Sequence, residues 1–406
     1  MTLIECFTQS HIDNIAACLR IKPEKMVLVG KIDEMEKHSE RYSKLLQQRG
    51  QNTEIALCDV TGDDFADICY AMADVICGEE ETIIDLTGGA EPVIMAVGAL
   101  LAGLDEGIRR RIRVEKYDRK TGAVIDCLHD NKPVIYDAVN LSIDEFVALH
   151  GGVTYDKGYQ PPENGGKREV DRLWKLASRD ATEWNRVLKW LIEFESRSDS
   201  DKQVFLPLGY IRHGIDDFDK KEKAVRDLLA EFGKYGIIDD QSSRSALEYT
   251  YTSDLVHHCT RKEGNILEVK TLLEGRGVTQ NGVPFFGDCR MSVNIDWDGI
   301  RHQPDEKIAD THNEVDVVLM HGMTPLFVSC KNGNVHQELY KLNTVAERFG
   351  GPYARKMLIV SDLESKGSAA CRALEQRARD MGVELVKGAA DLSAEEWQEI
   401  FVKAMQ

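Results

Sequence analysis

The sequence predicts an α/β protein in which a doubly wound, mainly parallel sheet comes first and a second α/β unit comes last. Apolar strand-like runs alternate with helix-like segments over the first ~140 residues, which is the pattern of a parallel sheet covered by helices. The Gly- and Pro-rich stretch QPPENGG at 160–166 is typical of a linker. Beyond it, two β-rich runs flank a glycine-containing turn, and further strand and helix patterns follow.

The N-terminal alternation is regular. Apolar runs of strand length are each followed by a segment with helical periodicity. The predicted strands are 3–7, 26–30, 54–58 and 82–86, and the predicted helices are 11–19, 34–48, 64–76 and 92–104. Two shorter runs, 111–117 and 123–128, predict a hairpin at the end of this unit.

In doubly wound sheets, ligands bind at the carboxyl ends of the strands. The residues expected there are Thr8, Gln9 and Ser10 after the first strand, and Asp85, Thr87, Gly88 and Gly89 after the fourth. Glycines and a hydroxyl before a helix suit an anion, because backbone amides approach phosphate closely and the helix dipole favours negative charge. The turn matches neither the Walker nor the GxGxxG spacing, and a tight turn that binds nothing is the alternative.

The middle of the chain predicts a connector. Residues 168–177, 182–194 and 220–235 have helical patterns, and 247–252 has a strand pattern, which suits a small winged-helix-like or helical unit. Basic side chains on the first two of these helices are interpreted as a solvated face. The expected division is therefore 1–150, a linker and connector at 151–260, and a C-terminal unit at 261–406.

The most specific chemistry lies in NEVDVVLMHGMTPLFVSCKNG at 313–333. Its runs 315–320 and 326–330 predict an antiparallel hairpin that brings Asp316 and Lys331 together near its open end. Metal-dependent nucleases of the PD-(D/E)XK class place an acidic metal ligand and a catalytic lysine in this way. Phosphodiester hydrolysis requires a divalent cation, and Mg²⁺ and Mn²⁺ prefer carboxylate oxygens. A plain cross-strand ion pair is the alternative.

The class pattern has Glu two residues before the lysine, and here that position is Ser329. Three other carboxylates are candidates for the missing charge: Glu314 on the same strand face as Asp316, Glu338 on a predicted helix at 335–349, and Glu268 within GNILEVKTLLEG. We select Glu268 because the class commonly has a helical acid upstream of the hairpin. The predicted site comprises Asp316, Glu268 and the carbonyl of Cys330 at the metal, Lys331 at the attacking water, and Ser329 as a weaker contributor.

Composition sets the outer limits. With 406 residues, the chain exceeds the size of one ordinary core, so two or three domains are expected. The net charge of −18 argues against indiscriminate binding of nucleic acid. No apolar run reaches the ~20 residues that span a bilayer, and no signal peptide is recognised. The ten cysteines are dispersed without metal-site spacing, which favours reduced thiols in a cytoplasmic protein.

Together, the strand-TGG-helix segment and the later NEVDVV, FVSCKNG and ELYKLNTVAERFGG resemble the CRISPR-associated nucleases that join a CARF sensor domain to a PD-(D/E)XK nuclease. The resemblance covers most of the chain, and its C-terminal run is the most specific part. It implies a Rossmann-like CARF fold for 1–150 and a restriction-endonuclease-like fold for 261–406. By position, Ser10, Thr87, Gly88 and Gly89 match the sensor loops, and Asp316 and Lys331 match the nuclease core.

The same resemblance implies a homodimer that binds one cyclic oligoadenylate, usually cyclic tetra-adenylate, across a two-fold axis. Binding would activate Mn²⁺- or Mg²⁺-dependent cleavage of DNA, and of RNA in some cases, in type III CRISPR antiviral defence. Two rival functions remain open at this point. One is a non-catalytic, ligand-responsive regulator with a decayed nuclease fold, and the other is a ring nuclease that degrades its own cyclic ligand.

Overall fold

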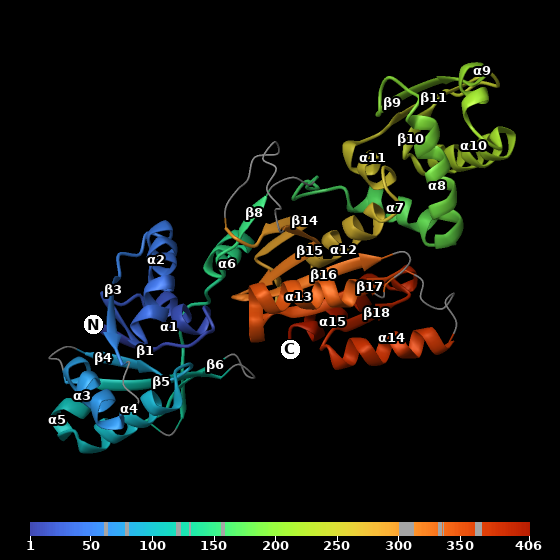
Figure 1. The fold of residues 1–406 in the computed structure, drawn as a ribbon. Coiled ribbons are helices and arrows are strands. Elements are labelled where there is room, and N and C mark those ends of the chain that lie inside the picture. Colours follow the sequence, from blue (N-terminus) through green and yellow to red (C-terminus); the bar gives the residue numbers. More distant parts are fainter. Residues whose placement is uncertain are drawn as a thin grey trace.

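The computed structural model describes residues 1–60, 64–77, 81–118, 123–129, 131–155, 159–299, 312–331, 335, 337–361 and 368–406. A C-terminal sheet with its helices lies between an N-terminal sheet unit and a smaller connector unit (Figure 1). One apolar core is shared by the N-terminal and C-terminal units, and a second core is shared by the connector and the C-terminal unit. The C-terminal unit is thus packed against both of the others.

The N-terminal unit contains a seven-stranded sheet in the order β3-β2-β1-β4-β5-β6-β7 within the described residues. Its strands are β1 (Thr2–Cys6), β2 (Lys25–Gly30), β3 (Glu54–Asp59), β4 (Thr82–Asp85), β5 (Ile112–Asp118), β6 (Ala123–Asp126) and β7 (Lys132–Val134). The five strands β1 to β5 run parallel, and β6 and β7 pair antiparallel. This confirms the doubly wound sheet and its terminal hairpin, whose turn at 119–122 lies outside the described residues.

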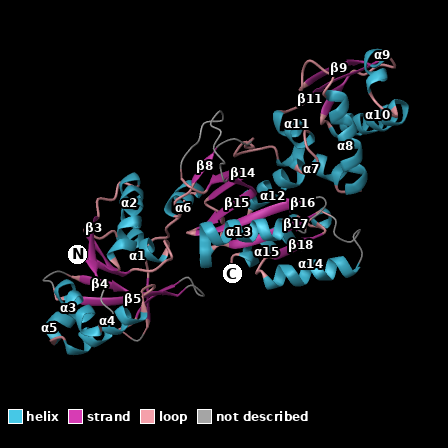
Figure 2. Ribbon diagram, in the orientation of Figure 1, coloured by secondary structure: helices cyan, strands magenta, loops and turns pink. Residues whose placement is uncertain are grey.

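Helices cover both faces of this sheet (Figure 2). α1 (Asp13–Ile21) and α2 (Ile32–Gln48) pack on one face, while α3 (Phe65–Ile76) and α4 (Glu91–Gly103) pack on the other. The short α5 (Glu106–Arg109) leads into β5. Alternate residues of each strand point to opposite faces of the sheet: Leu3 packs on the side of α1, and Ile4 packs on the side of α4. That is why the parallel strands read as continuous apolar runs.

The C-terminal sheet has the order β18-β17-β16-β15-β14-β8. Its strands are β8 (Val153–Tyr155), β14 (Asp288–Asp296), β15 (His312–His321), β16 (Thr324–Lys331), β17 (Arg355–Val360) and β18 (Glu384–Lys387). β14, β15 and β16 are antiparallel, and β16, β17 and β18 are parallel. The predicted hairpin is therefore confirmed. The edge strand β8 comes from the stretch expected to be linker, because it pairs with β14 far along the sequence.

Four helices flank this second sheet. α12 (Asn265–Gly277) and α15 (Ala394–Ala404) pack on one face, and α13 (Glu338–Gly350) and α14 (Ser368–Asp380) pack on the other. Ser393 and Glu396 form the capping box predicted for the last helix. A small pair, β12 (Thr279–Gln280) and β13 (Val283–Pro284), follows α12.

The connector has a three-stranded antiparallel sheet in the order β10-β11-β9. Its strands are β9 (Gln203–Pro207), β10 (Ile238–Asp240) and β11 (Ala246–Tyr251), and its helices are α7 (Lys167–Ala177), α8 (Ala181–Glu195), α9 (Leu208–Ile211), α10 (Phe218–Tyr235) and α11 (Asp254–Thr260). Mixed helices and a small sheet agree with the predicted connector. The division at residues 150 and 260 stays a prediction.

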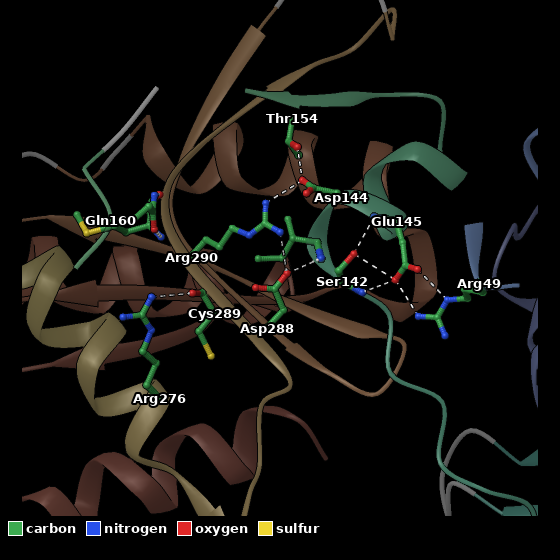
Figure 3. Close-up of polar contacts among 12 residues, drawn as sticks. Arg49, Ser142, Asp144, Glu145, Thr154, Gln160, Arg276, Asp288, Cys289 and Arg290 are labelled. Carbon is green, nitrogen blue, oxygen red and sulfur yellow. Dashed lines mark hydrogen bonds and ion pairs between the residues drawn. The ribbon is translucent and has the colours of Figure 1, made fainter. Parts of the chain in front are cut away.

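A short helix, α6 (Ile143–Leu149), ties the N-terminal and C-terminal units together (Figure 3). Arg49, just after α2, donates to both carboxylate oxygens of Glu145 at 2.7 and 2.8 Å. On the other side of the joint, Arg290 of β14 binds Asp144 at 2.8 Å. We call α6 with these two ion pairs the α6 joint. The α6 joint thus contacts both units.

No helix among the described residues is long and apolar enough to cross a membrane. All ten cysteines lie in the described ranges, and each is a free thiol.

Candidate functional site

The β15–β16 hairpin brings Asp316 and Lys331 into contact. The Lys331 ammonium lies 3.0 Å from Oδ2 of Asp316, which is largely buried at 8% exposure. The same oxygen accepts hydrogen bonds from the backbone N of Cys330 at 2.7 Å and from the hydroxyl of Ser329 at 3.0 Å. Three donors on one oxygen fix the carboxylate in place. All three of these donors bond Oδ2 of Asp316, and none of them bonds Oδ1.

Glu268 lies on α12, as the sequence predicts, and its side chain is buried. Burial, and next the negative charge of Asp316, raise the pKa of Glu268 to about 7. The charge on Lys331 acts in the opposite direction. The structure therefore places Glu268 within electrostatic reach of the hairpin, and the two carboxylates repel one another. A bound cation would relieve that repulsion.

Glu338, a candidate acid that was not selected from the sequence, contacts both Ser329 and Lys331. Its Oε2 lies 3.5 Å from the Lys331 ammonium and 3.4 Å from the Ser329 hydroxyl. Glu314 lines a shallow hollow together with Asp316 and Glu338. Glu314 and Glu338 are thus gathered at this end of the hairpin, and among the described residues only Glu338 of the two contacts the lysine.

The donor set suits Mg²⁺ or Mn²⁺, because it consists of carboxylate oxygens beside a buried, repelling pair of acids. Among the described residues, no group of three His, Cys, Asp or Glu side chains is close enough to hold a metal ion as arranged. Coordination of one cation by three of these acids would therefore require side-chain rotation, whereas water and phosphate oxygens commonly complete a shell that begins with one or two carboxylates. The proposed role of the Cys330 carbonyl stays a prediction.

Other acidic residues of this unit form hydrogen bonds and ion pairs that hold α6 or a buried turn in place. Asp288 accepts a hydrogen bond from the backbone N of Ile143 at 2.9 Å and binds Arg290 at 3.2 Å (Figure 3). Asp296 is fully buried. Its Oδ1 accepts from the backbone N of Asp298 at 3.0 Å, which explains how a carboxylate is accommodated in the core.

A second candidate site lies at the carboxyl ends of β1 and β4, which are adjacent and parallel. The two loops touch. A Cβ on Gly88 would lie 2.6 Å from Cγ2 of Thr8, and a Cβ on Gly89 would lie 2.5 Å from Cβ of Cys6. Gly89 also has φ of +104°. Both glycines are therefore needed for the loops to approach each other, as the predicted cradle requires.

The side chains of the β4 loop bond to the protein itself. Oδ1 of Asp85 accepts from the backbone N of Thr87 at 2.7 Å and also from its hydroxyl. That hydroxyl accepts from the backbone N of Tyr117 at 2.9 Å. Burial raises the pKa of Asp85 to about 6, although both hydrogen bonds from Thr87 lower it. These side chains shape the loop, so anion binding by its glycine backbone stays a prediction.

The β1 loop is held by a residue that the sequence analysis did not single out. Asn14 accepts from the backbone N of Thr8 at 2.8 Å and donates to its carbonyl at 2.7 Å. Gln9 donates to Glu34 at 2.7 Å. Ser10 accepts weakly, at 3.4 Å, from the backbone N of Asp13, where α1 begins. In the sequence, the feature that could have indicated these contacts is an Asn in the first turn of a helix, because Asn side chains often bond to nearby backbone.

No protein-family model and no curated protein sequence matches the chain. Comparison of structures gives matches over its entire length. A crystal structure of protein VC1899 from Vibrio cholerae matches with a TM-score of 0.72 and 15% identity, covering 100% of this chain and 97% of that one. Can2 from Sulfobacillus thermosulfidooxidans, in complex with cyclic tetra-adenylate, matches with a TM-score of 0.65 and 15% identity, covering 100% and 99%.

The chain has the fold of Can2. The likeness covers both units and the connector, so it confirms the predicted fold class and the resemblance at the level of the fold. Identity of 15% transfers no residue role. The roles of the hairpin residues and of the loop residues therefore depend on the geometry described above.

Proposed function

We propose that the chain is a metal-dependent endonuclease activated by cyclic oligoadenylate. The observation that carries the proposal is the convergence of Ser329, Cys330 and Lys331 on one oxygen of the buried Asp316. A structural ion pair would not need a second buried acid, Glu268, within electrostatic reach of it. Burying repelling carboxylates costs stability, and such costs are typical of functional sites.

Asp316 and Glu268 would hold Mn²⁺ or Mg²⁺ by carboxylate oxygens. When bound, the cation would lower the pKa of an attacking water and offset phosphate charge. Lys331 would orient that water and stabilise charge on the phosphate, because its ammonium is held at the rim of the site by Asp316. Ser329 would keep Asp316 in its present rotamer. The substrate class is a phosphodiester strand of DNA or RNA.

The activating ligand would lie against the loops at 8–10 and 87–89, where glycine backbone can approach a phosphate. Cyclic tetra-adenylate is the expected ligand, and its complex with the structurally similar Can2 supports this choice. A homodimer would let two copies of the loops enclose one ring. The exposed apolar side chains of α3 and α4, including Tyr70 at 81% and Met95 at 64% exposure, support a second copy on that face.

An assay on purified protein tests the proposed function. We expect cleavage of supercoiled plasmid, single-stranded DNA or RNA with Mn²⁺ only when cyclic tetra-adenylate is present. Chelation of Mn²⁺ should abolish it. Tight ligand binding without cleavage of any substrate would favour the non-catalytic regulator. Conversion of the ring to linear adenylates by the full chain would favour a ring nuclease.

The α6 joint gives a second prediction, on coupling. Arg49→Ala removes both hydrogen bonds to Glu145 and thus one side of the joint. We expect unchanged affinity for cyclic tetra-adenylate, with ligand-stimulated cleavage reduced about tenfold, since coupling energies are commonly 1–3 kcal/mol. Titration calorimetry and cleavage rates measure the two quantities separately.

The control is Arg110→Ala, which removes an exposed ion pair with Glu106 in the same unit. It should change neither quantity. Equal stimulation of the Arg49→Ala and wild-type proteins would show that the joint does not transmit the signal.

A further inference from the structure

The hairpin lacks one carboxylate of its class. Ser329 stands two residues before Lys331, where the class has an acid that binds the metal. Its hydroxyl is neutral and is a poorer ligand for Mg²⁺ or Mn²⁺ than a carboxylate. With Asp316 and Glu268 alone, the proposed metal site would be short of charge. Another side chain must therefore supply the missing negative charge.

Glu338 is placed to do so. It is the first residue of α13, the helix that packs on the face of the sheet carrying Asp316 and Ser329. Its Oε2 is 3.4 Å from the Ser329 hydroxyl, which also lies 3.0 Å from Oδ2 of Asp316. A hydroxyl has one hydrogen, so it cannot donate to both acids at once. The two carboxylates therefore converge on a group that satisfies only one of them.

The Lys331 ammonium lies between the same two carboxylates, at 3.0 Å from Asp316 and 3.5 Å from Glu338. A single cationic group is thus held by two acids. Lysine has a long, flexible side chain, so it can leave this position when a divalent cation arrives.

The size of Ser329 is consistent with this arrangement. Ser329 is buried, with 7% exposure, and directly faces both carboxylates. A glutamate at that position would bring a third negative charge against Asp316 and Glu338. The small residue leaves room for an acid that enters from the helix.

We propose that Glu338 is the metal-binding carboxylate that this chain uses in place of the acid expected at position 329. The metal site would then gain a carboxylate from α13 (Glu338), which lines the same hollow as Asp316 of β15. This inference rests on the proposed function. It adds that the metal-binding carboxylate lies on helix α13 instead of strand β16, and that a glutamate introduced at position 329 can substitute for Glu338.

The test uses the full chain with cyclic tetra-adenylate and measures Mn²⁺ affinity by electron paramagnetic resonance alongside cleavage rate. Glu338→Gln keeps the shape of the side chain and removes its charge. We expect Mn²⁺ affinity to fall about 10–100-fold, with a comparable fall in cleavage. Glu347→Gln is the matched control, because Glu347 is an exposed acid on the same helix that contacts Asn343. It should behave as wild type.

A rescue variant separates a ligand from a structural acid. Ser329→Glu combined with Glu338→Gln restores the class pattern on the strand, and we expect at least tenfold recovery of Mn²⁺ affinity over Glu338→Gln alone. Ser329→Gln with Glu338→Gln has the same size without the charge and should recover nothing. Circular dichroism and the melting temperature confirm that each variant is folded.

The outcomes are distinguishable. Wild-type Mn²⁺ affinity and cleavage in Glu338→Gln would overturn the inference while the nuclease function stands. Equal recovery by the Ser329→Glu and Ser329→Gln double variants would also overturn it, because charge would then be irrelevant. Absence of Mn²⁺ binding and of cleavage in the wild-type protein would instead overturn the proposed function itself.

Discussion

Lys331→Ala is expected to reduce cleavage by on the order of 10²–10³-fold, the range found when one group that stabilises transition-state charge is removed. The ammonium contacts Asp316 and Glu338 and lies at the rim of the proposed metal site. Without it, the attacking water loses its orienting group and the phosphate loses a compensating charge. Single-turnover rates with saturating Mn²⁺ and cyclic tetra-adenylate measure the effect on chemistry rather than on binding.

The fold should survive this change. Asp316 keeps its hydrogen bonds from Ser329 and from the backbone of Cys330, so its carboxylate is still satisfied. Lys403→Ala is the control, because Lys403 forms an exposed ion pair on α15 of the same unit. If Lys331→Ala cleaves at the wild-type rate, the contact with Asp316 is a structural ion pair and the catalytic assignment is wrong.

Gly89→Ala is expected to abolish ligand activation. At φ of +104°, an added Cβ is strained, and it would lie 2.5 Å from Cβ of Cys6, which is closer than real Cβ contacts. Such backbone strain costs about 1–3 kcal/mol. The loop after β4 must therefore move away from β1, and the backbone amides lose their common anion-binding arrangement. We expect affinity for cyclic tetra-adenylate to fall by roughly 100-fold or more, measured by calorimetry.

Gly107→Ala is the matched control for that variant. Gly107 has no neighbour within 4 Å of an added Cβ and has no positive φ. It should leave affinity and activation unchanged. Full activation of Gly89→Ala would show that the β4 loop does not bind the ligand, and it would direct attention to other surfaces of the N-terminal unit.

Local pattern was enough to predict the elements. Buried parallel strands are apolar on both faces, and helices repeat every 3.6 residues, so 3–7, 26–30 and their successors stand out without tertiary information. The hairpin around HGMT was predictable for the same reason. It brought Asp316 and Lys331 to the same end of the hairpin, because two strands joined by a short turn have a defined register, here with Val317 opposite Val328.

Features that depend on contacts between residues far apart in the sequence could not be predicted from local pattern. The strand β8 was hidden in a stretch that resembles a linker, because its partner β14 comes more than a hundred residues later. Asn14 looked like any helix residue, and its clamp on Thr8 depends on how α1 lies against β1. The arrangement of the α6 joint likewise requires Arg49 and Arg290 to meet one helix from different units.

By itself, the sequence determined the fold class and the central pair Asp316 and Lys331, because periodicity and a short turn act over neighbouring residues. Only the tertiary structure decided which of the candidate acids contacts Lys331. Glu314 lies on the hairpin strand β15 itself. Glu268 and Glu338 are equivalent as carboxylates, and their distances to the hairpin depend on how α12 and α13 pack on the sheet. Electrostatic effects fall off with distance and strengthen with burial, so that packing is what distinguishes the acids.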